Sequence, residues 1–135
     1  MSAGTDAAGL ESTGLLAGRL LLAAIFIHEG IAKLGNYAGA AVYSKTFGVP
    51  EMLLPLAIAL ELGCGLLVAL GLYTRAAALL LSLFCLLTAA LFHSKLGERN
   101  QLLHFEKNFA MAGGFLVLAM TGPGRLTLGR MLGQT

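Results

Sequence analysis

Charged residues are scarce in this chain. Asp, Glu, Lys and Arg make up 12% of its 135 residues, against about 25% in a typical soluble domain. Hydrophobic residues make up 57%, and the mean hydropathy is +0.81. A chain of this length and composition predicts a single domain that has lipid as its solvent.

Several functional motifs are missing as well. There is no run of five or more basic residues and the net charge is only +2, which argues against a nucleic-acid partner. No nucleophile elbow, phosphate-binding loop or EF-hand pattern is present, which argues against hydrolases and nucleotide enzymes. Cys64 and Cys85 form no Cys-x-x-Cys motif, so we expect both to pack as small hydrophobic residues.

The first 14 residues contain no Lys or Arg. A cleaved secretory signal needs a basic start followed by a short apolar stretch. The apolar run at residues 15–34 is too long for such a signal and is therefore expected to be retained as a membrane helix.

Four apolar segments with short connectors predict the fold. A hydrocarbon layer about 30 Å thick needs roughly 20 apolar residues in a helix, and short connectors favour antiparallel neighbours. We therefore predict an all-α integral membrane protein, an up-down-up-down four-helix bundle over residues 15–122. The expected helices are 15–34, 51–72, 76–93 and 104–121.

The remaining segments are assigned by their polarity. Residues 1–14 are expected to form a polar N-terminal tail, and residues 123–135 a short C-terminal tail. Between the first two helices, residues 35–50 contain Tyr37 and Tyr43, which suit the lipid headgroup region. We expect a short segment there that lies in the membrane interface.

The first helix carries ionisable residues on one face. Arg19, Leu22, Phe26, Glu29 and Lys33 follow steps of three and four residues, so they share one stripe. Charged groups in membrane helices face the interior of a bundle or a wet cavity. This stripe is therefore predicted to face inward.

Antiparallel helices bring most polar side chains to one side of the bundle. The other side holds Arg19, Arg75, Arg125 and Arg130, which are expected to snorkel toward the interface. The three histidines follow no helical ligand spacing, so no metal site is predicted. The gathered candidates are His28, Glu29, Lys33, His93, Gln101, His104, Lys107 and Asn108, with Glu61 deeper in the membrane.

This cluster has two interpretations. In the first, the cluster is a structural network in which Glu61 pairs with Lys33 or Lys107, and Glu29 pairs with the other lysine. Alternatively, it is a polar pocket open to one membrane face that binds a small headgroup or passes protons. Glu61 is then the candidate proton-exchanging group, because an unpaired carboxylate at that depth holds its proton.

Several short motifs in order resemble the DoxX family of small membrane proteins. The resemblance covers about residues 15–128. It implies a multi-pass protein of the bacterial inner membrane with both termini in the cytoplasm. The matching motifs are Gly-Arg-Leu-Leu-Leu (18–22), Glu-Leu-Gly-Cys-Gly (61–65), Gly-Leu-Tyr-Thr-Arg (71–75), Phe-x-Lys-Asn (105–108) and Gly-Pro-Gly-Arg-Leu-Thr (122–127).

The family is named after a membrane subunit of a thiosulfate:quinone oxidoreductase. The resemblance therefore implies a small subunit of a redox assembly that has no intrinsic cofactor, with quinone as the candidate ligand. His93, Lys107 and Asn108 would bind a quinone or sulfur-oxyanion headgroup, and Glu61 would exchange protons. Besides the lipid bilayer, the expected partners are other subunits or further copies of the chain. The alternative is a non-enzymatic scaffold or anchor whose polar network is only structural.

Overall fold

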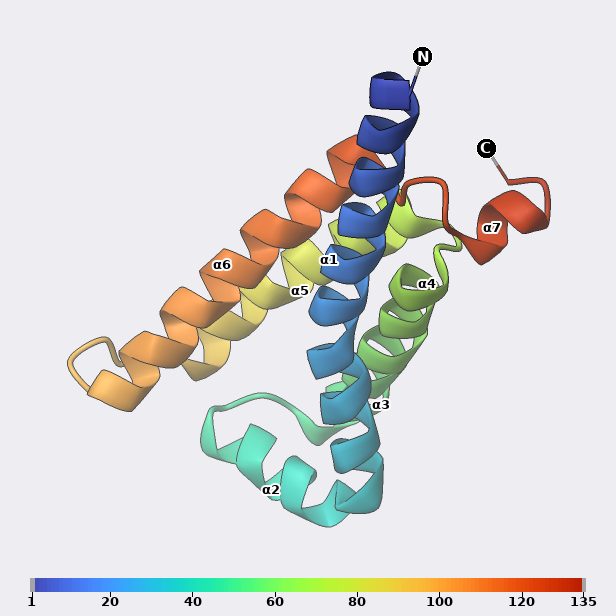
Figure 1. The fold of residues 1–135 in the computed structure, drawn as a ribbon. Helices are drawn as coiled ribbons and strands as arrows, with labels where there is room; N and C mark the ends of the chain where they lie inside the picture. The colour runs from blue at the N-terminus through green and yellow to red at the C-terminus, as the bar shows by residue number, and fades with distance from the viewer. Residues whose placement is uncertain (1, 135) are drawn as a thin grey trace.

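The computed structural model describes residues 2–134, and this part of the chain is all-helical, with no strand (Figure 1). Three segments are long and apolar enough to cross a bilayer, namely Gly4–Gly35, Glu51–Leu70 and Thr74–Phe92. The elements are α1 (Ser2–Gly35), α2 (Tyr37–Thr46), η1 (Glu51–Leu53), α3 (Leu54–Ala59), η2 (Leu60–Cys64), α4 (Gly65–Leu70), α5 (Thr74–Phe92), α6 (Arg99–Thr121) and α7 (Leu128–Met131).

Helix α1 is longer than the sequence predicts. It begins at Ser2 rather than near residue 15, so the residues expected to form a polar tail are helical. No proline interrupts them, and the hydroxyls of Ser12 and Thr13 donate to the carbonyls of Ala8 and Gly9, four residues back. These polar residues therefore remain compatible with the helix.

The second apolar segment is not a uniform α-helix. A π-helical turn, η2, separates α3 from α4, and it includes Glu61. The segment ends at Leu70, because Gly71 adopts a left-handed conformation with φ 72°. Tyr73 has φ 44°, so the chain turns sharply between α4 and α5.

Helix α2 forms within the connector expected to lie in the membrane interface. The side chain of Asn36 caps it by accepting from the backbone N–H of Gly39 at 3.2 Å. Tyr43 of α2 and Phe47, which directly follows α2, contact Phe92 at the end of α5, with ring centroids 5.8 Å and 5.3 Å from that of Phe92. These rings join α2 to α5.

Helices α5 and α6 form an antiparallel hairpin (Figure 1). Ser82 Oγ donates to the carbonyl of Ala112 at 2.9 Å between them. Helix α6 begins at Arg99, earlier than the predicted residue 104. The hairpin packs on α1, η2 and α4, and it diverges from α3 toward the end where α2 lies (Figure 1). The main core includes Ala23, Phe26, Cys64, Val68, Ala77, Ala78, Leu81, Cys85, Phe115 and Ala119; both cysteines are free and buried.

Arg19 does not snorkel, contrary to the sequence-based expectation. It is 2% exposed and donates to the carbonyls of Ala69, Pro123 and Leu126 at 3.3, 2.6 and 2.7 Å. The reason is that the chain after α6 folds back over α1 and supplies acceptors. The Arg19 guanidinium thus fastens α1 to the end of α4 and to the C-terminal segment.

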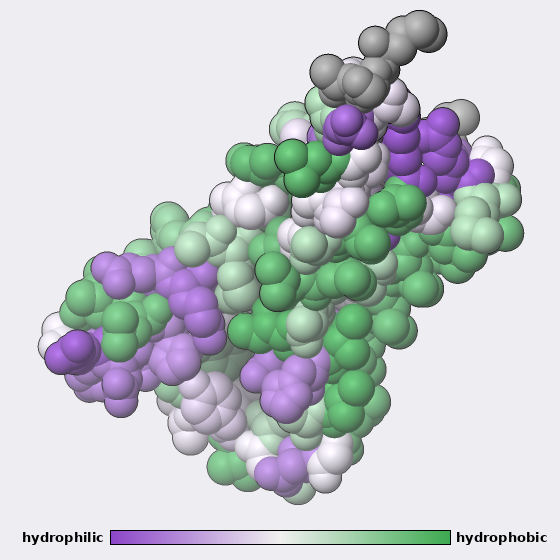
Figure 2. All heavy atoms as spheres, viewed as in Figure 1, coloured by the Kyte–Doolittle hydropathy of each residue, from purple (hydrophilic) through white to green (hydrophobic). Residues whose placement is uncertain are grey.

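The surface matches a lipid environment. Hydrophobic side chains cover much of the face in Figure 2, with polar patches toward the ends of the molecule. Leu21, Leu83 and Val117 are among the exposed apolar residues of α1, α5 and α6. Both termini lie at the same end, away from α2 (Figure 1).

Candidate functional site

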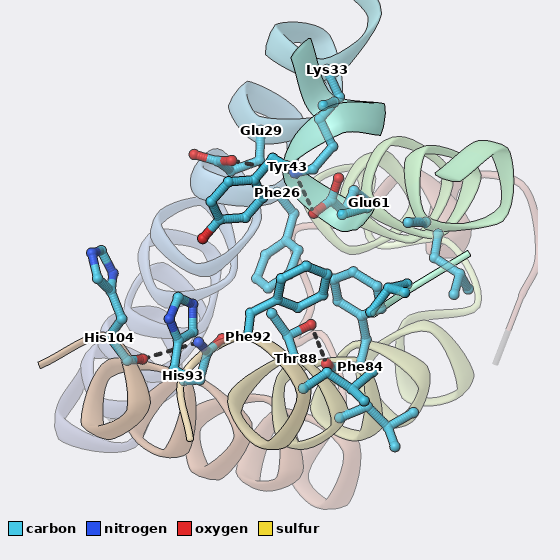
Figure 3. Close-up of a pocket in the computed structure, with 18 of the residues that line it drawn as sticks. Phe26, Glu29, Lys33, Tyr43, Glu61, Phe84, Thr88, Phe92, His93 and His104 are labelled. Carbon is cyan, nitrogen blue, oxygen red and sulfur yellow. Dashed lines mark hydrogen bonds and ion pairs between the residues drawn. The ribbon is translucent and has the colours of Figure 1, made fainter. Parts of the chain in front are cut away.

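A cavity of about 600 Å³ lies between α1, α2, α3, η2 and the α5–α6 hairpin (Figure 3). It occupies the region where the hairpin diverges from α3. The predicted site residues found in its lining are Glu29, Lys33, Glu61, His93, Gln101, Lys107 and Asn108; His104 also lines it.

His28 is the predicted site residue that does not line the cavity. Its side chain is exposed, and Glu29 beside it does line the cavity. The place of His28 among the site residues therefore stays a prediction.

Glu61, which is buried, and Lys33, which is partly exposed, form an ion pair at the centre of the site. Glu61 is 4% exposed, and its Oε1 accepts from Lys33 Nζ at 3.0 Å. Its Oε2 is buried and has no hydrogen-bond partner among the described residues. One oxygen of this carboxylate is therefore paired, while the other remains an unused acceptor.

The π turn accounts for the position of Glu61. A π turn adds a residue to an α-helix, and such turns occur frequently at functional sites. Close packing against α1 supports it: a Cβ added to Gly30 would lie 2.5 Å from Leu62 Cγ, and one added to Gly65 would lie 3.1 Å from Ile27 Cγ1. Glycine at these two positions lets α1 approach the turn, which brings Lys33 within reach of Glu61.

The pairing of the lysines differs from the network predicted by sequence. Lys33 contacts both carboxylates, with Glu29 Oε2 at 3.3 Å. Lys107 lies instead 3.3 Å from Nδ1 of His104. Because Lys107 can only donate, His104 accepts through Nδ1 and its imidazole is neutral in this arrangement.

The imidazoles of α5 and α6 form a second polar group on the far wall. The rings of His93 and His104 stack with centroids 5.0 Å apart, and His93 Nδ1 lies 3.0 Å from Gln101 Oε1. An amide oxygen accepts, so His93 carries a proton on Nδ1. Asn108 is buried and donates to the carbonyl of His104 at 3.0 Å.

Aromatic residues make up much of the apolar lining. Phe26, Tyr43, Phe84 and Phe92 all line the cavity (Figure 3), and the Phe26 and Phe84 rings meet edge to face. Sequence reasoning missed Phe84, Thr88 and Phe92. Their four-residue spacing along one helix face is the signal that could have identified them.

Comparison with known proteins identifies the family. The DoxX family model matches residues 14–94, which is more than half of the chain. The chain belongs to the DoxX family. The resemblance drawn from the sequence motifs is therefore confirmed.

Two relatives from Escherichia coli strain K12 are similar to this DoxX protein over most of their length. Inner membrane protein YqjF is 46% identical over 125 residues, which cover 93% of this chain and 96% of that protein. Inner membrane protein YphA is 34% identical over 123 residues, covering 86% and 88%. No solved structure matches. This DoxX protein is thus a small integral membrane protein whose relatives occupy the inner membrane.

The cavity has the features of a small-molecule site. Its volume falls in the range of ligand pockets, which are mainly apolar with a few placed polar groups. In this DoxX protein those groups include Glu61, whose buried Oε2 has no hydrogen-bond partner among the described residues, and Lys107 and Asn108 of α6. The arrangement suits a headgroup with a hydrogen-bond donor at one end and an acceptor at the other.

Proposed function

We propose that this DoxX protein is the small membrane subunit of a redox assembly in the bacterial inner membrane, and that its cavity binds a quinone headgroup. The observation that carries the proposal is that Glu61 lines the cavity and that its buried Oε2 has no partner among the described residues. A buried acceptor without a donor costs free energy, so a ligand that donates to it gains affinity.

The polar groups are arranged for such a ligand. Bound there, a quinone supplies two-electron, two-proton chemistry, and the electrons pass to or from a centre in another subunit. Glu61 accepts the hydrogen bond of a hydroxyl and holds or releases its proton. Lys107 and Asn108 donate from α6 to a carbonyl oxygen, while His93, whose Nδ1–H is directed at Gln101, accepts from a hydroxyl through Nε2.

The proposal includes four membrane crossings, by α1, the α3–α4 segment, α5 and α6. Helix α6 has 23 residues, about 34 Å at 1.5 Å per residue, which is enough to cross a hydrocarbon layer. Four crossings in alternating directions put both termini on one side, which we assign to the cytoplasm. The polar part of the cavity then lies toward the opposite face, near α2.

Purification from native membranes tests the redox role. A partner subunit is expected to co-purify and to show the absorption of flavin, haem or an iron–sulfur cluster. Glu61→Gln and Lys107→Met are expected to abolish quinone-linked turnover of that assembly while the protein still inserts. Glu106→Gln and Lys95→Met are matched controls, because both residues are exposed and neither lines the cavity. Turnover that is unchanged in Glu61→Gln and Lys107→Met would overturn the proposal.

One observation favours a second function, that of a membrane scaffold. Lys33 joins α1 to the π turn through Glu61, so the ion pair also holds two helices in register. If this is its whole role, Glu61→Gln lowers thermal stability in detergent and leaves the function of the assembly intact.

A further inference from the structure

The cavity reaches the outer surface of the molecule at apolar residues. Four leucines line it: Leu53 at the end of η1, Leu56 in α3, and Leu87 and Leu91 in α5. Each is between 46% and 57% exposed. A side chain that borders the cavity and is half exposed marks a place where the cavity meets the exterior. The opening therefore lies between α3 and α5, where the hairpin diverges from α3 (Figure 1).

This opening faces hydrocarbon. It lies between two of the segments that are long and apolar enough to cross the bilayer. A rim of leucine side chains offers no hydrogen bonds to replace the hydration that a polar solute loses on passing it. A hydrocarbon chain that comes from the bilayer has no hydration to lose there.

Helix α2 covers part of the cavity at its other end. Tyr43 and Phe47 contact Phe92 across that end, and Lys45 of α2 forms an ion pair with Glu51 of η1. Helix α2 is thus attached to both α5 and the start of the second apolar segment. Three polar lining residues, Glu29, His104 and Lys107, are themselves exposed, so the cavity has a polar opening in addition to the gap between α3 and α5.

Behind the leucine rim lies the buried acceptor. Glu61 follows Leu56 by five residues on the same segment, and its Oε2 has no partner among the described residues. An occupant that satisfies both features has a hydrocarbon chain at the rim and a hydrogen-bond donor at its inner end. The two features together define an amphiphile rather than a water-soluble substrate.

We infer that the cavity takes a chain-bearing amphiphile directly from the bilayer through the gap between α3 and α5, with its headgroup at Glu61 and its chain against the four leucines. The nature of the headgroup rests on the proposed function, whereas the route and the chain do not. Two sources share this chemistry, the isoprenoid chain of a quinone and the acyl chain of a phospholipid.

Tryptophan fluorescence tests the inference, since the chain contains no tryptophan. Phe84→Trp on α5 and Met111→Trp on α6 each place one reporter in the cavity lining. Val117→Trp is the lipid-facing reference, because Val117 is 63% exposed, and Phe115→Trp is the core reference, because Phe115 is fully buried. Each variant of the full-length protein is reconstituted in phosphatidylcholine vesicles.

Two quenching experiments distinguish the sources. In vesicles with brominated acyl chains, quenching of the cavity reporters to at least half the extent of Val117→Trp identifies a phospholipid chain in the cavity. In unbrominated vesicles, a long-chain benzoquinone and its chainless analogue are compared at equal membrane concentration. Stronger quenching of the cavity reporters by the long-chain compound identifies a quinone chain in the cavity. Either result supports the inference.

The inference is overturned if both cavity reporters are quenched no more than Phe115→Trp in both experiments. The proposed function then still stands if the chainless quinone binds in a manner that depends on Glu61. The opposite result is also possible: brominated chains quench the cavity reporters, while Glu61→Gln leaves quinone-linked turnover unchanged. That result would support the inference and contradict the proposed function.

Discussion

Lys33 Nζ lies 3.0 Å from Glu61 Oε1 and 3.3 Å from Glu29 Oε2, so one ammonium group serves two carboxylates. Glu61 is the buried member, while the other two side chains are partly exposed to solvent in the isolated protein. These three side chains link α1, which carries Lys33 and Glu29, to the π turn, which carries Glu61. The three residues are therefore not equivalent, and replacing them has different consequences.

Lys33→Met is expected to destabilise the protein more than Glu61→Gln. Removing the lysine leaves a buried carboxylate without its cation, at a cost of about 2–4 kcal/mol. The glutamine variant leaves no buried charge, and its amide oxygen still accepts from Lys33. Thermal unfolding in detergent measures the difference. Equal losses in the two variants, with Lys95→Met as the neutral control, would contradict the asymmetry.

Arg19→Met is expected to lower the free energy of unfolding by about 2–4 kcal/mol, since three carbonyls lose a charged donor. Arg19→Lys restores only part of this, because an ammonium group cannot span all three acceptors as a guanidinium does. Limited proteolysis then finds the segment after α6 more accessible. The exposed Arg130 provides the control as Arg130→Met, and a similar loss there would show that the three hydrogen bonds of Arg19 contribute little.

Gly30→Ala is expected to destabilise the protein by about 1–3 kcal/mol, because the added methyl group overlaps Leu62. Gly18 on the same helix has nothing within 4 Å of its Cβ position, so Gly18→Ala is expected to be neutral or slightly stabilising. Thermal unfolding of the two variants side by side tests the close approach of α1 to the π turn. The prediction fails if the order of stability is reversed.

Thiol labelling in intact cells tests the four-crossing topology. Ser94 lies in the connector between α5 and α6, and Gln134 lies near the C-terminus. Ser94→Cys is expected to react with a membrane-impermeant maleimide added outside the inner membrane, whereas Gln134→Cys reacts only after lysis. Cys64 and Cys85 are buried and contribute little background. Labelling of both positions from the same side would exclude the topology.

The inward stripe on the first helix could be predicted because it depends only on helical spacing. Phe26 is buried and Arg19 almost completely so, while Glu29 and Lys33 line the cavity. The destination of Arg19 could not be predicted in the same way. Its acceptors come from Ala69, Pro123 and Leu126, and nothing in the first helix indicates that the C-terminal segment folds over it.

The π turn marks another limit of reasoning from sequence. The sequence places Ala57, Glu61, Gly65 and Ala69 at four-residue steps, which would put them on one face only if the whole segment were a regular α-helix. The inserted residue in η2 shifts that register, so a uniform helix describes the segment only on either side of the turn. Glu61 was still identified, because a carboxylate in an apolar run stands out whatever the helix type.

Isothermal titration calorimetry tests most directly whether Glu61 receives a ligand in the cavity. It measures the affinity of the purified protein, in lipid nanodiscs, for a short-chain hydroquinone. We expect saturable binding to the wild-type protein and to Glu106→Gln. Binding to Glu61→Gln is expected to be at least tenfold weaker, a loss of about 1.4 kcal/mol in binding free energy. Binding of equal strength in all three proteins, or no binding to the wild-type protein, would contradict the claim that Glu61 receives a ligand in this cavity.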